Sequence, residues 1–372
     1  MLKRRSFFYF FASGNLRKTS CGERERCLPV EVRNRFQKGW LIVLASLAGA
    51  VVCPAGETAW RGITISCQTY GKEWATPEMK ESLVEIKSMG ANAFAIHPYA
   101  RINGDGSIHF PDNPAQDWIV KPARWAREMN LTLMLAPHLA YWGSPFEWRG
   151  AIKFDSEGEW DRFFADYSRW MLGLAEVCER EGIPLLCIGL EYSHATQHEQ
   201  RWRELIGKIR AVYKGKITYG SNWNEYRDLK FWDALDYVGI LAYFPLATPN
   251  DPAPDEQKLR EAWQKWLAEL KTYSVKMKKP VVFTELGYNE SSMAAAHPWA
   301  YPTGGPDAVG MQKRCLKIAL EETGGTDFLA GVFLWKWFPG LLDLGSENFD
   351  LRKPAPKAVI HEVWGRKAAP AS

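Results

Sequence analysis

The chain has 372 residues, of which 46% are hydrophobic and 24% are charged, so it can bury a sizeable core in one large domain behind an N-terminal extension. Its net charge of +4 comes from one end, because residues 1–39 carry ten Lys and Arg against three Asp and Glu, which leaves 37 basic and 40 acidic residues after them. Recognition of nucleic acid normally needs a clustered basic face, so this balance excludes nucleic acid as a partner of the folded part.

An export signal is the first element that the sequence predicts. Basic residues at positions 33, 35 and 38 precede the apolar run from Trp40 to Cys53, and Pro54 and Gly56 follow it. This order of charged, apolar and cleavage regions is typical of exported proteins, and about 14 apolar residues are too few to span a bilayer comfortably. A buried strand or helix is the alternative. We therefore expect residues 1–56 to be an N-terminal extension with a signal peptide.

The expected location follows from that signal. A protein processed after it would be secreted or periplasmic and would keep no stable membrane span. Cys53 leaves a lipid anchor open as an alternative, although Val52 is not the small residue usually found just before a lipidated cysteine.

The remaining cysteines do not indicate a metal site. The expected folded part contains Cys67, Cys178, Cys187 and Cys315, without metal-ligand spacing or a regular disulfide framework. We interpret them as buried thiols, with one disulfide as the open alternative in an oxidising compartment. No glycine-rich phosphate loop follows the first strand, and we expect no metal and no cofactor.

An α/β barrel is the fold that the pattern from Trp60 onward predicts. Short β-branched runs alternate with longer helical patterns, which is the signature of βα units and a parallel sheet. The eight expected strands are 62–66, 93–97, 131–137, 185–190, 216–221, 237–242, 281–284 and 328–335. We therefore expect a single (β/α)8 TIM barrel over residues 57–366, followed by a flexible tail at 367–372.

Helix signals separate several of these strands. Thr76 and Pro77 begin a helix that ends at Gly90, and Ser156 with Glu159 forms a capping box ahead of an aromatic stripe. The stripe is interpreted as core and consists of Trp160, Phe163, Phe164, Tyr167, Trp170, Met171 and Leu174. Two further apolar stripes predict helices over 202–212 and 259–273.

The residues that close the strands are the candidate site, because active sites of such barrels lie at the carboxyl ends of the strands. They are His97, His138, Glu191, Asn222, Trp223, Tyr243, Glu285 and Trp335. Two carboxylates, two imidazoles, an amide and several aromatic rings together predict a carbohydrate site.

The two carboxylates, Glu191 and Glu285, match the needs of glycosidic bond hydrolysis. One carboxyl group must protonate the leaving oxygen, and another must attack the anomeric carbon or activate water there. We expect the desolvated mouth of the barrel to raise the pKa of the acid, while hydrogen bonds keep the nucleophile ionised. For either glutamate alone, a surface salt bridge is the alternative interpretation.

Several segments resemble clan A glycoside hydrolases, and most closely the family 113 β-mannanases. They are IGLEYS around Glu191, GSNW around Asn222, FWDALDYVGILAYFPL, TELGY around Glu285 and FLWKWFP. The resemblance extends from about Gly62 to Trp364. It implies a retaining hydrolase acting on β-1,4-linked mannan or a related plant polysaccharide, with Glu191 as acid/base and Glu285 as nucleophile.

The same resemblance implies supporting roles around the two glutamates. Tyr243 would hydrogen-bond the nucleophile, Trp335 would floor the subsite of the cleaved sugar, and His138 and Asn222 would hold sugar hydroxyls. One position departs from the family pattern, because Leu190 stands where members place Asn or Thr before the acid/base. A leucine cannot donate to a sugar hydroxyl, so this departure bears on the preferred sugar more than on the reaction class.

Further tryptophans are candidate stacking platforms for sugar rings, with core packing as the alternative for each. They are Trp142, Trp148, Trp223, Trp299 and Trp337. His97 and Tyr99 could form one wall of the cleft, although a packed structural histidine accounts equally well for His97.

Other functions remain open from the sequence. A β-glucanase, an exo-mannosidase or a transglycosylase could use the same barrel, since fold does not fix substrate. A carbohydrate-binding protein that has lost catalysis is an alternative from a different class. In each case we expect a monomer that binds β-linked polysaccharide or oligosaccharide.

Overall fold

The computed structural model describes residues 59–251, 254–301, 303–340 and 348–365. The expected signal peptide and the expected tail at 367–372 lie outside these residues. No helix in the described ranges is long and apolar enough to cross a membrane.

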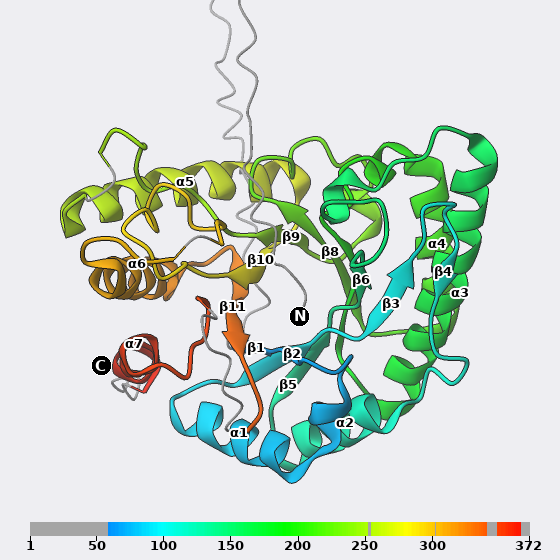
Figure 1. Cartoon of the computed structure of the whole chain (residues 1–372), viewed down its shortest axis with the longest axis horizontal. Helices are drawn as coiled ribbons and strands as arrows, with labels where there is room; N and C mark the ends of the chain where they lie inside the picture. Colours follow the sequence, from blue (N-terminus) through cyan, green and yellow to red (C-terminus); the bar gives the residue numbers. More distant parts are fainter. Residues whose placement is uncertain (1–58, 252–253, 302, 341–347, 366–372) are drawn as a thin grey trace, which may run out of the picture. The chain divides into compact units, whose positions relative to one another are not determined.

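A closed barrel of eight parallel strands forms the centre of the described chain (Figure 1). In their order around the barrel, the strands are β1 (Trp60–Ile65), β11 (Leu329–Trp337), β10 (Val281–Leu286), β9 (Val238–Leu241), β8 (Lys216–Asn222), β7 (Leu185–Leu190), β5 (Thr132–Leu135) and β2 (Ala93–Ile96). Each of them overlaps one of the eight strands predicted from the sequence. The (β/α)8 prediction is therefore confirmed.

Helices surround this barrel (Figure 1). They are α1 (Pro77–Ser88), α2 (Asp117–Glu128), α3 (Glu157–Glu181), α4 (Glu199–Val212), α5 (Glu256–Met277), α6 (Ala308–Thr323) and α7 (Pro354–Trp364). The sequence patterns indicated α1, α3, α4 and α5, and the expected capping box of Ser156 and Glu159 begins α3. The sequence signals for α2 and α6 are weaker. Pro122 lies inside α2, and Asp307, the residue before α6, forms no side-chain cap with it.

Two apolar layers stabilise the fold. The barrel interior contains Met134, Leu185, Val282 and Phe333, and a larger layer lies between strands and helices. The aromatic stripe of α3 is buried in that outer layer, as expected. The four described cysteines are free thiols, of which Cys178, Cys187 and Cys315 are buried. Burial raises the pKa of each of these three thiols, so they remain protonated at neutral pH.

A small second sheet, which the sequence did not predict, extends one side of the barrel. It consists of β3 (Tyr99–Ile102), β4 (Ile108–His109) and β6 (His138–Ala140). Pro98 and Pro137 interrupt the backbone ladder after β2 and β5, because proline has no N–H to donate. The chain then pairs again, with Tyr99 opposite His138 in parallel register. This pairing brings His138 beyond the end of its barrel strand.

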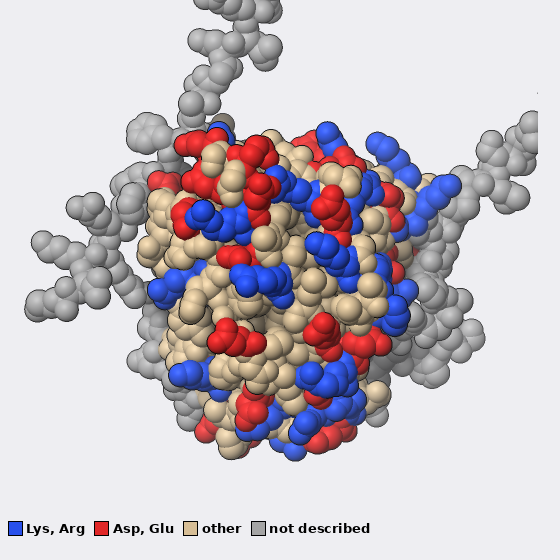
Figure 2. Space-filling view, turned by 90° about the vertical axis from the view of Figure 1, so that its right-hand side faces the viewer, with Lys and Arg blue, Asp and Glu red and all other residues tan. Residues whose placement is uncertain are grey.

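Charged side chains mix on the face that carries α3 and α4. Figure 2 shows Lys and Arg interleaved with Asp and Glu there, without a continuous area of one sign. Several of these groups form ion pairs, such as that of Arg201 with Glu157 and that of Arg203 with Asp233. This face therefore lacks the basic surface that nucleic-acid binding requires.

Candidate active site

Glu191 follows the last residue of β7 and has an unusual backbone. Its φ of 60° lies in the left-handed region, which costs a non-glycine residue about 1–2 kcal/mol. Two hydrogen bonds hold this conformation: the N–H of Glu191 donates to the Gly220 carbonyl at 3.0 Å, and the N–H of Ser193 donates to the Glu191 carbonyl at 2.9 Å. Such local strain is often found at functional positions.

Glu285 lies inside β10 and is buried. The hydroxyl of Tyr243 donates to Oε2 of Glu285 at 2.7 Å, which is the contact that the family resemblance implied. Nε2 of His138 lies 3.9 Å from the other carboxylate oxygen, Oε1. Both oxygens of this carboxylate are therefore faced by a polar side chain.

Arg149 connects the surroundings of the two glutamates and was missed by the sequence analysis. It lies on the short 3-10 helix η2 (Arg149–Ala151), within a loop that no strand end or motif marks. Its guanidinium donates to Oε2 of Glu191 at 2.9 Å and to the Leu139 carbonyl at 3.1 Å, and it lies 3.0 Å from Nδ1 of His138. Only the folded loop reveals these partners.

The contact with Arg149 decides the tautomer of His138. A guanidinium has only donors, so Nδ1 must accept and the neutral ring carries its proton on Nε2. Burial, followed by the charge of Arg149, holds the pKa of His138 well below its usual value, which keeps the ring neutral. The N–H of Nε2 therefore faces Oε1 of Glu285 at 3.9 Å, and a chain of polar side chains leads from Glu191 through Arg149 and His138 to Glu285.

The pKa shift within the pair of glutamates differs from the expectation. We expected a raised pKa for the acid and an ionised nucleophile, but the raised pKa belongs to Glu285. Burial is the largest cause and the charge of Glu191 is the second, while the hydrogen bond from Tyr243 lowers the value. The physical reason is the position of Glu285 inside a strand, away from the guanidinium that Glu191 contacts directly.

Three rings form an aromatic stack beside the carboxylates. Trp335 lies nearly parallel to His138, with ring centroids 5.8 Å apart, and His97 stacks on His138 at 4.6 Å. His97 is 0% exposed and neither of its ring nitrogens has a partner among the described residues. The packed-histidine interpretation therefore fits His97, which supports the ring of His138.

The remaining candidate residues separate into rim and interior positions. Trp142 is 51% exposed beside Tyr99, and Trp223 stacks on Trp299, which is 40% exposed. Trp337 is 1% exposed and lies under Lys357 of α7, so we do not retain it as a stacking platform.

Polar contacts near Glu191 involve Asn222 and a second glutamate. The amide of Asn222 donates to Oε2 of Glu225 at 3.0 Å, and the Ser193 hydroxyl donates to the same oxygen at 2.8 Å. Leu190 is buried in a small apolar cluster with Leu241, Tyr243 and Phe349. The position before Glu191 thus contributes packing in place of a polar group.

Comparisons with known proteins agree with this fold. None of the curated proteins matches the chain. The model of Glycoside Hydrolase Family 113 matches residues 63–348. A solved complex of a GH113 β-1,4-mannanase is 23% identical with a TM-score of 0.71, covering 83% of this chain and 99% of its own.

Two further solved structures share the fold. The GH113 β-mannanase from Alicyclobacillus acidocaldarius, in complex with ManMIm, is 24% identical with a TM-score of 0.70, covering 82% of this chain and 97% of its own. The endo-β-1,4-mannanase from Thermotoga petrophila is 11% identical with a TM-score of 0.53, covering 85% and 79%. At these identities the structures support the fold alone, whereas the family match spans most of the chain. The chain therefore belongs to Glycoside Hydrolase Family 113.

Proposed function

We propose that this glycoside hydrolase cleaves β-1,4-linked mannan with retention of configuration, using Glu191 as acid/base and Glu285 as nucleophile. The observation that carries the proposal is the polar chain between the two glutamates, at the carboxyl ends of β7 and β10 in a family 113 barrel. Two carboxyl groups at this end of the barrel are what glycosidic bond cleavage requires.

The reaction would proceed in two displacements. In the first, a carboxylate oxygen of Glu285 bonds to the anomeric carbon while the glycosidic C–O bond breaks and Glu191 protonates the leaving oxygen. In the second, water attacks the anomeric carbon, Glu191 accepts the proton of that water, and the bond to Glu285 breaks. Tyr243 and His138 face the two oxygens of Glu285 and would orient it for attack.

The protonation of the pair sets a condition on the first displacement. The raised pKa of Glu285 and its dependence on Glu191 mean that the two carboxyl groups resist being charged together. The first displacement needs this one proton on Glu191, whereas the raised pKa favours it on Glu285 in the free protein, so the proton must move to Glu191 when substrate binds. Activity should therefore fall as the pH drops through the raised pKa of Glu285, about 8, because a protonated carboxyl group is a poor nucleophile.

A β-1,4-mannan is the preferred substrate class because the solved family members carry that activity in their names. The exposed Trp142 and Trp299 fit a polysaccharide, since an indole face can cover the apolar face of a sugar ring. Leu190 favours a second candidate, a related hydrolase with another sugar preference such as a β-glucanase, because it removes a polar group beside the acid/base.

A hydrolysis assay on mannan, glucomannan and xylan tests the substrate. We expect reducing sugar from mannan at the highest rate, and faster release from a pure β-glucan would favour the second candidate. Proton NMR of the earliest product tests the stereochemistry. The β anomer should appear first, whereas an initial α anomer would indicate a single displacement by water.

We also propose that the protein acts outside the cytoplasm as a monomer. The charged and apolar order of residues 1–56 supports export. N-terminal sequencing of the processed protein should find a start near position 57, and light scattering should give the mass of one chain. A lipid on Cys53 would instead appear as a mass increase at a mature N-terminal cysteine.

A further inference from the structure

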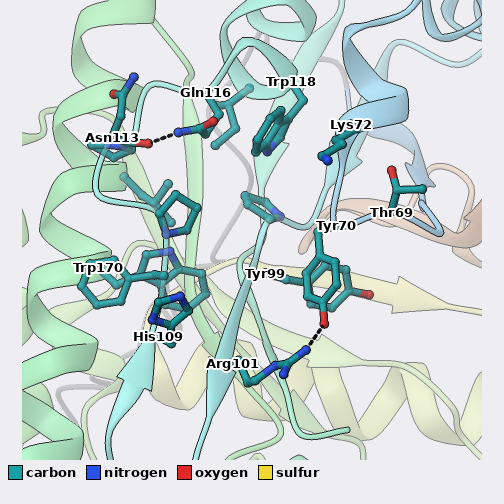
Figure 3. A pocket seen from close by; sticks show the side chains of 16 residues that line it. Thr69, Tyr70, Lys72, Tyr99, Arg101, His109, Asn113, Gln116, Trp118 and Trp170 are labelled. Atoms are coloured by element: carbon teal, nitrogen blue, oxygen red, sulfur yellow. Dashed lines mark hydrogen bonds between the residues drawn. The ribbon is translucent and has the colours of Figure 1, made fainter.

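A pocket with a volume of about 490 Å³ lies beside Tyr99, whose ring contacts that of His138. Residues following β1, the strand β3 and the start of α2 line it (Figure 3). This volume is in the range of pockets that bind small molecules. Neither Glu191 nor Glu285 lines the pocket, so the proposed reaction does not account for it.

Tyr99 separates this pocket from the catalytic residues. Its ring lies edge-on to His138 and His97, with centroids 5.8 and 5.2 Å apart, and it also contacts Tyr70 at 5.9 Å and Trp142 at 5.4 Å. Tyr70 and Tyr99 both line the pocket, while His138 lies beside Glu285. A sugar in the pocket would therefore be one aromatic ring away from the catalytic cluster.

The lining suits a sugar ring. Trp170 and Leu174 of α3 are buried in the wall, and Trp118 and Tyr70 add aromatic surface. The amide side chains of Asn113 and Gln116 lie across the pocket from the tyrosines (Figure 3). Aromatic surface with a few polar groups is the usual composition of a small-molecule site.

The charged residues that line the pocket are all basic. Lys72 and Arg101 lie on either side of the two tyrosines (Figure 3), and no Asp or Glu is among the lining residues. Arg101 donates to the hydroxyl of Tyr70 at 2.8 Å. Among the arginines that the structure describes, only Arg61 and Arg101 form no ion pair, and Arg61 donates to the Gly90 carbonyl. Arg101 thus keeps donors available for an anionic ligand.

We propose that this pocket is an auxiliary subsite for a sugar unit that carries a carboxylate, such as a uronic acid branch on the polysaccharide. An arginine presents two parallel N–H groups to a carboxylate, which makes it the preferred partner for this group. The role as a subsite rests on the proposed function, because it requires that the enzyme cleaves the polysaccharide. The binding of an acidic sugar to the pocket does not depend on that function. The ammonium of Lys72 adds a second positive charge to the same pocket.

Ligand titration of the full chain by NMR tests the binding. Methyl β-glucuronoside should bind at least about tenfold more tightly than methyl β-glucoside, because hydrogen bonds to charged groups are strong. Arg101→Gln should abolish this preference, and Lys72→Gln should weaken it. Lys208→Gln, which removes an exposed charge on α4, is the matched control and should leave the preference unchanged.

Three results would overturn the binding proposal. Equal affinity for the acidic and the neutral glycoside would remove the role of charge, and an undiminished preference in Arg101→Gln would place the ligand elsewhere. Displacement of the glucuronoside by inorganic sulfate at equal concentration would indicate an anion site without sugar recognition.

Kinetics then test the subsite role. Two manno-oligosaccharides that differ only in a glucuronic acid or a glucose branch at the same position are compared with the unbranched chain. The wild type should show a higher kcat/KM on the acidic branch, and Arg101→Gln should lose only this advantage. Equal kcat/KM on the two branches overturns the subsite role. Failure to cleave the unbranched chain contradicts the proposed function instead, and leaves the NMR result to decide the pocket.

Discussion

The two sides of the barrel mouth hold their glutamates in different ways. Glu191 follows a strand, has a left-handed backbone and contacts a guanidinium from a loop. Glu285 lies within a strand, is buried, and receives its hydrogen bond from a neutral tyrosine. Glu191 is thus positioned by a charged donor from a loop, and Glu285 by a neutral donor that follows β9.

Replacing each glutamate by glutamine should have the largest effect and should separate the two sides. We expect Glu191→Gln and Glu285→Gln each to lower turnover on mannan by a factor of about 100 to 10,000. An aryl mannoside whose leaving group needs no proton should still give a burst of aryl alcohol with Glu191→Gln, and none with Glu285→Gln. A variant that keeps nearly full activity but unfolds more easily would make its glutamate a structural ion-pair partner.

Removing Arg149 should remove the link between the two sides. Arg149→Met leaves Glu191 and Nδ1 of His138 without their donor, and a buried unsatisfied group costs about 1–3 kcal/mol. Since about 1.4 kcal/mol corresponds to tenfold in rate, we expect kcat to fall about tenfold to a hundredfold. Arg201→Met, which breaks ion pairs on the outside of the barrel, should leave kcat unchanged. Equal losses in both variants would mean that Arg149 acts only through stability.

The dependence of Tm on pH should differ between variants of the two glutamates, with a smaller effect than on activity. The folded-state pKa of Glu285 is raised, so its contribution to stability is present below the unfolded-state pKa and is lost as pH rises through the folded-state value. Glu285→Gln should therefore raise the Tm at alkaline pH, and this gain should fade in acid. Glu191→Gln should give no such gain, because it weakens the contact with Arg149. Calorimetry at two pH values measures both, and a lower Tm for Glu285→Gln in alkali would contradict the burial argument.

The smallest expected effect concerns Leu190 on the Glu191 side. Leu190→Thr places a hydroxyl group before the proposed acid/base at some cost in packing against Tyr243 and Phe349. We expect the ratio of mannan to glucomannan hydrolysis to change by less than about tenfold, the size of one neutral hydrogen bond. Leu241→Thr, in the same apolar cluster, controls for packing alone. The same ratio change in both variants would assign the effect to packing.

The sequence by itself determined the eight strands and placed the candidate side chains at or near their carboxyl ends, although Glu285 and Trp335 lie inside β10 and β11. Strand length, β-branched runs and helix caps are local signals, so β7 and β10 could be placed together with Glu191 and Glu285 after or near their ends. In a closed parallel barrel all carboxyl ends point the same way, so strand ends alone indicate a shared site.

Only the tertiary structure decided how those side chains are paired. Arg149, the second sheet and the tautomer of His138 depend on contacts between segments far apart in the chain, for which the sequence has no local signal. The difference between buried Trp337 and exposed Trp142 has the same origin, because burial depends on what packs against a ring and not on the ring itself. The raised pKa of Glu285 likewise follows from burial and from the charge of Glu191, both of which exist only in the folded barrel.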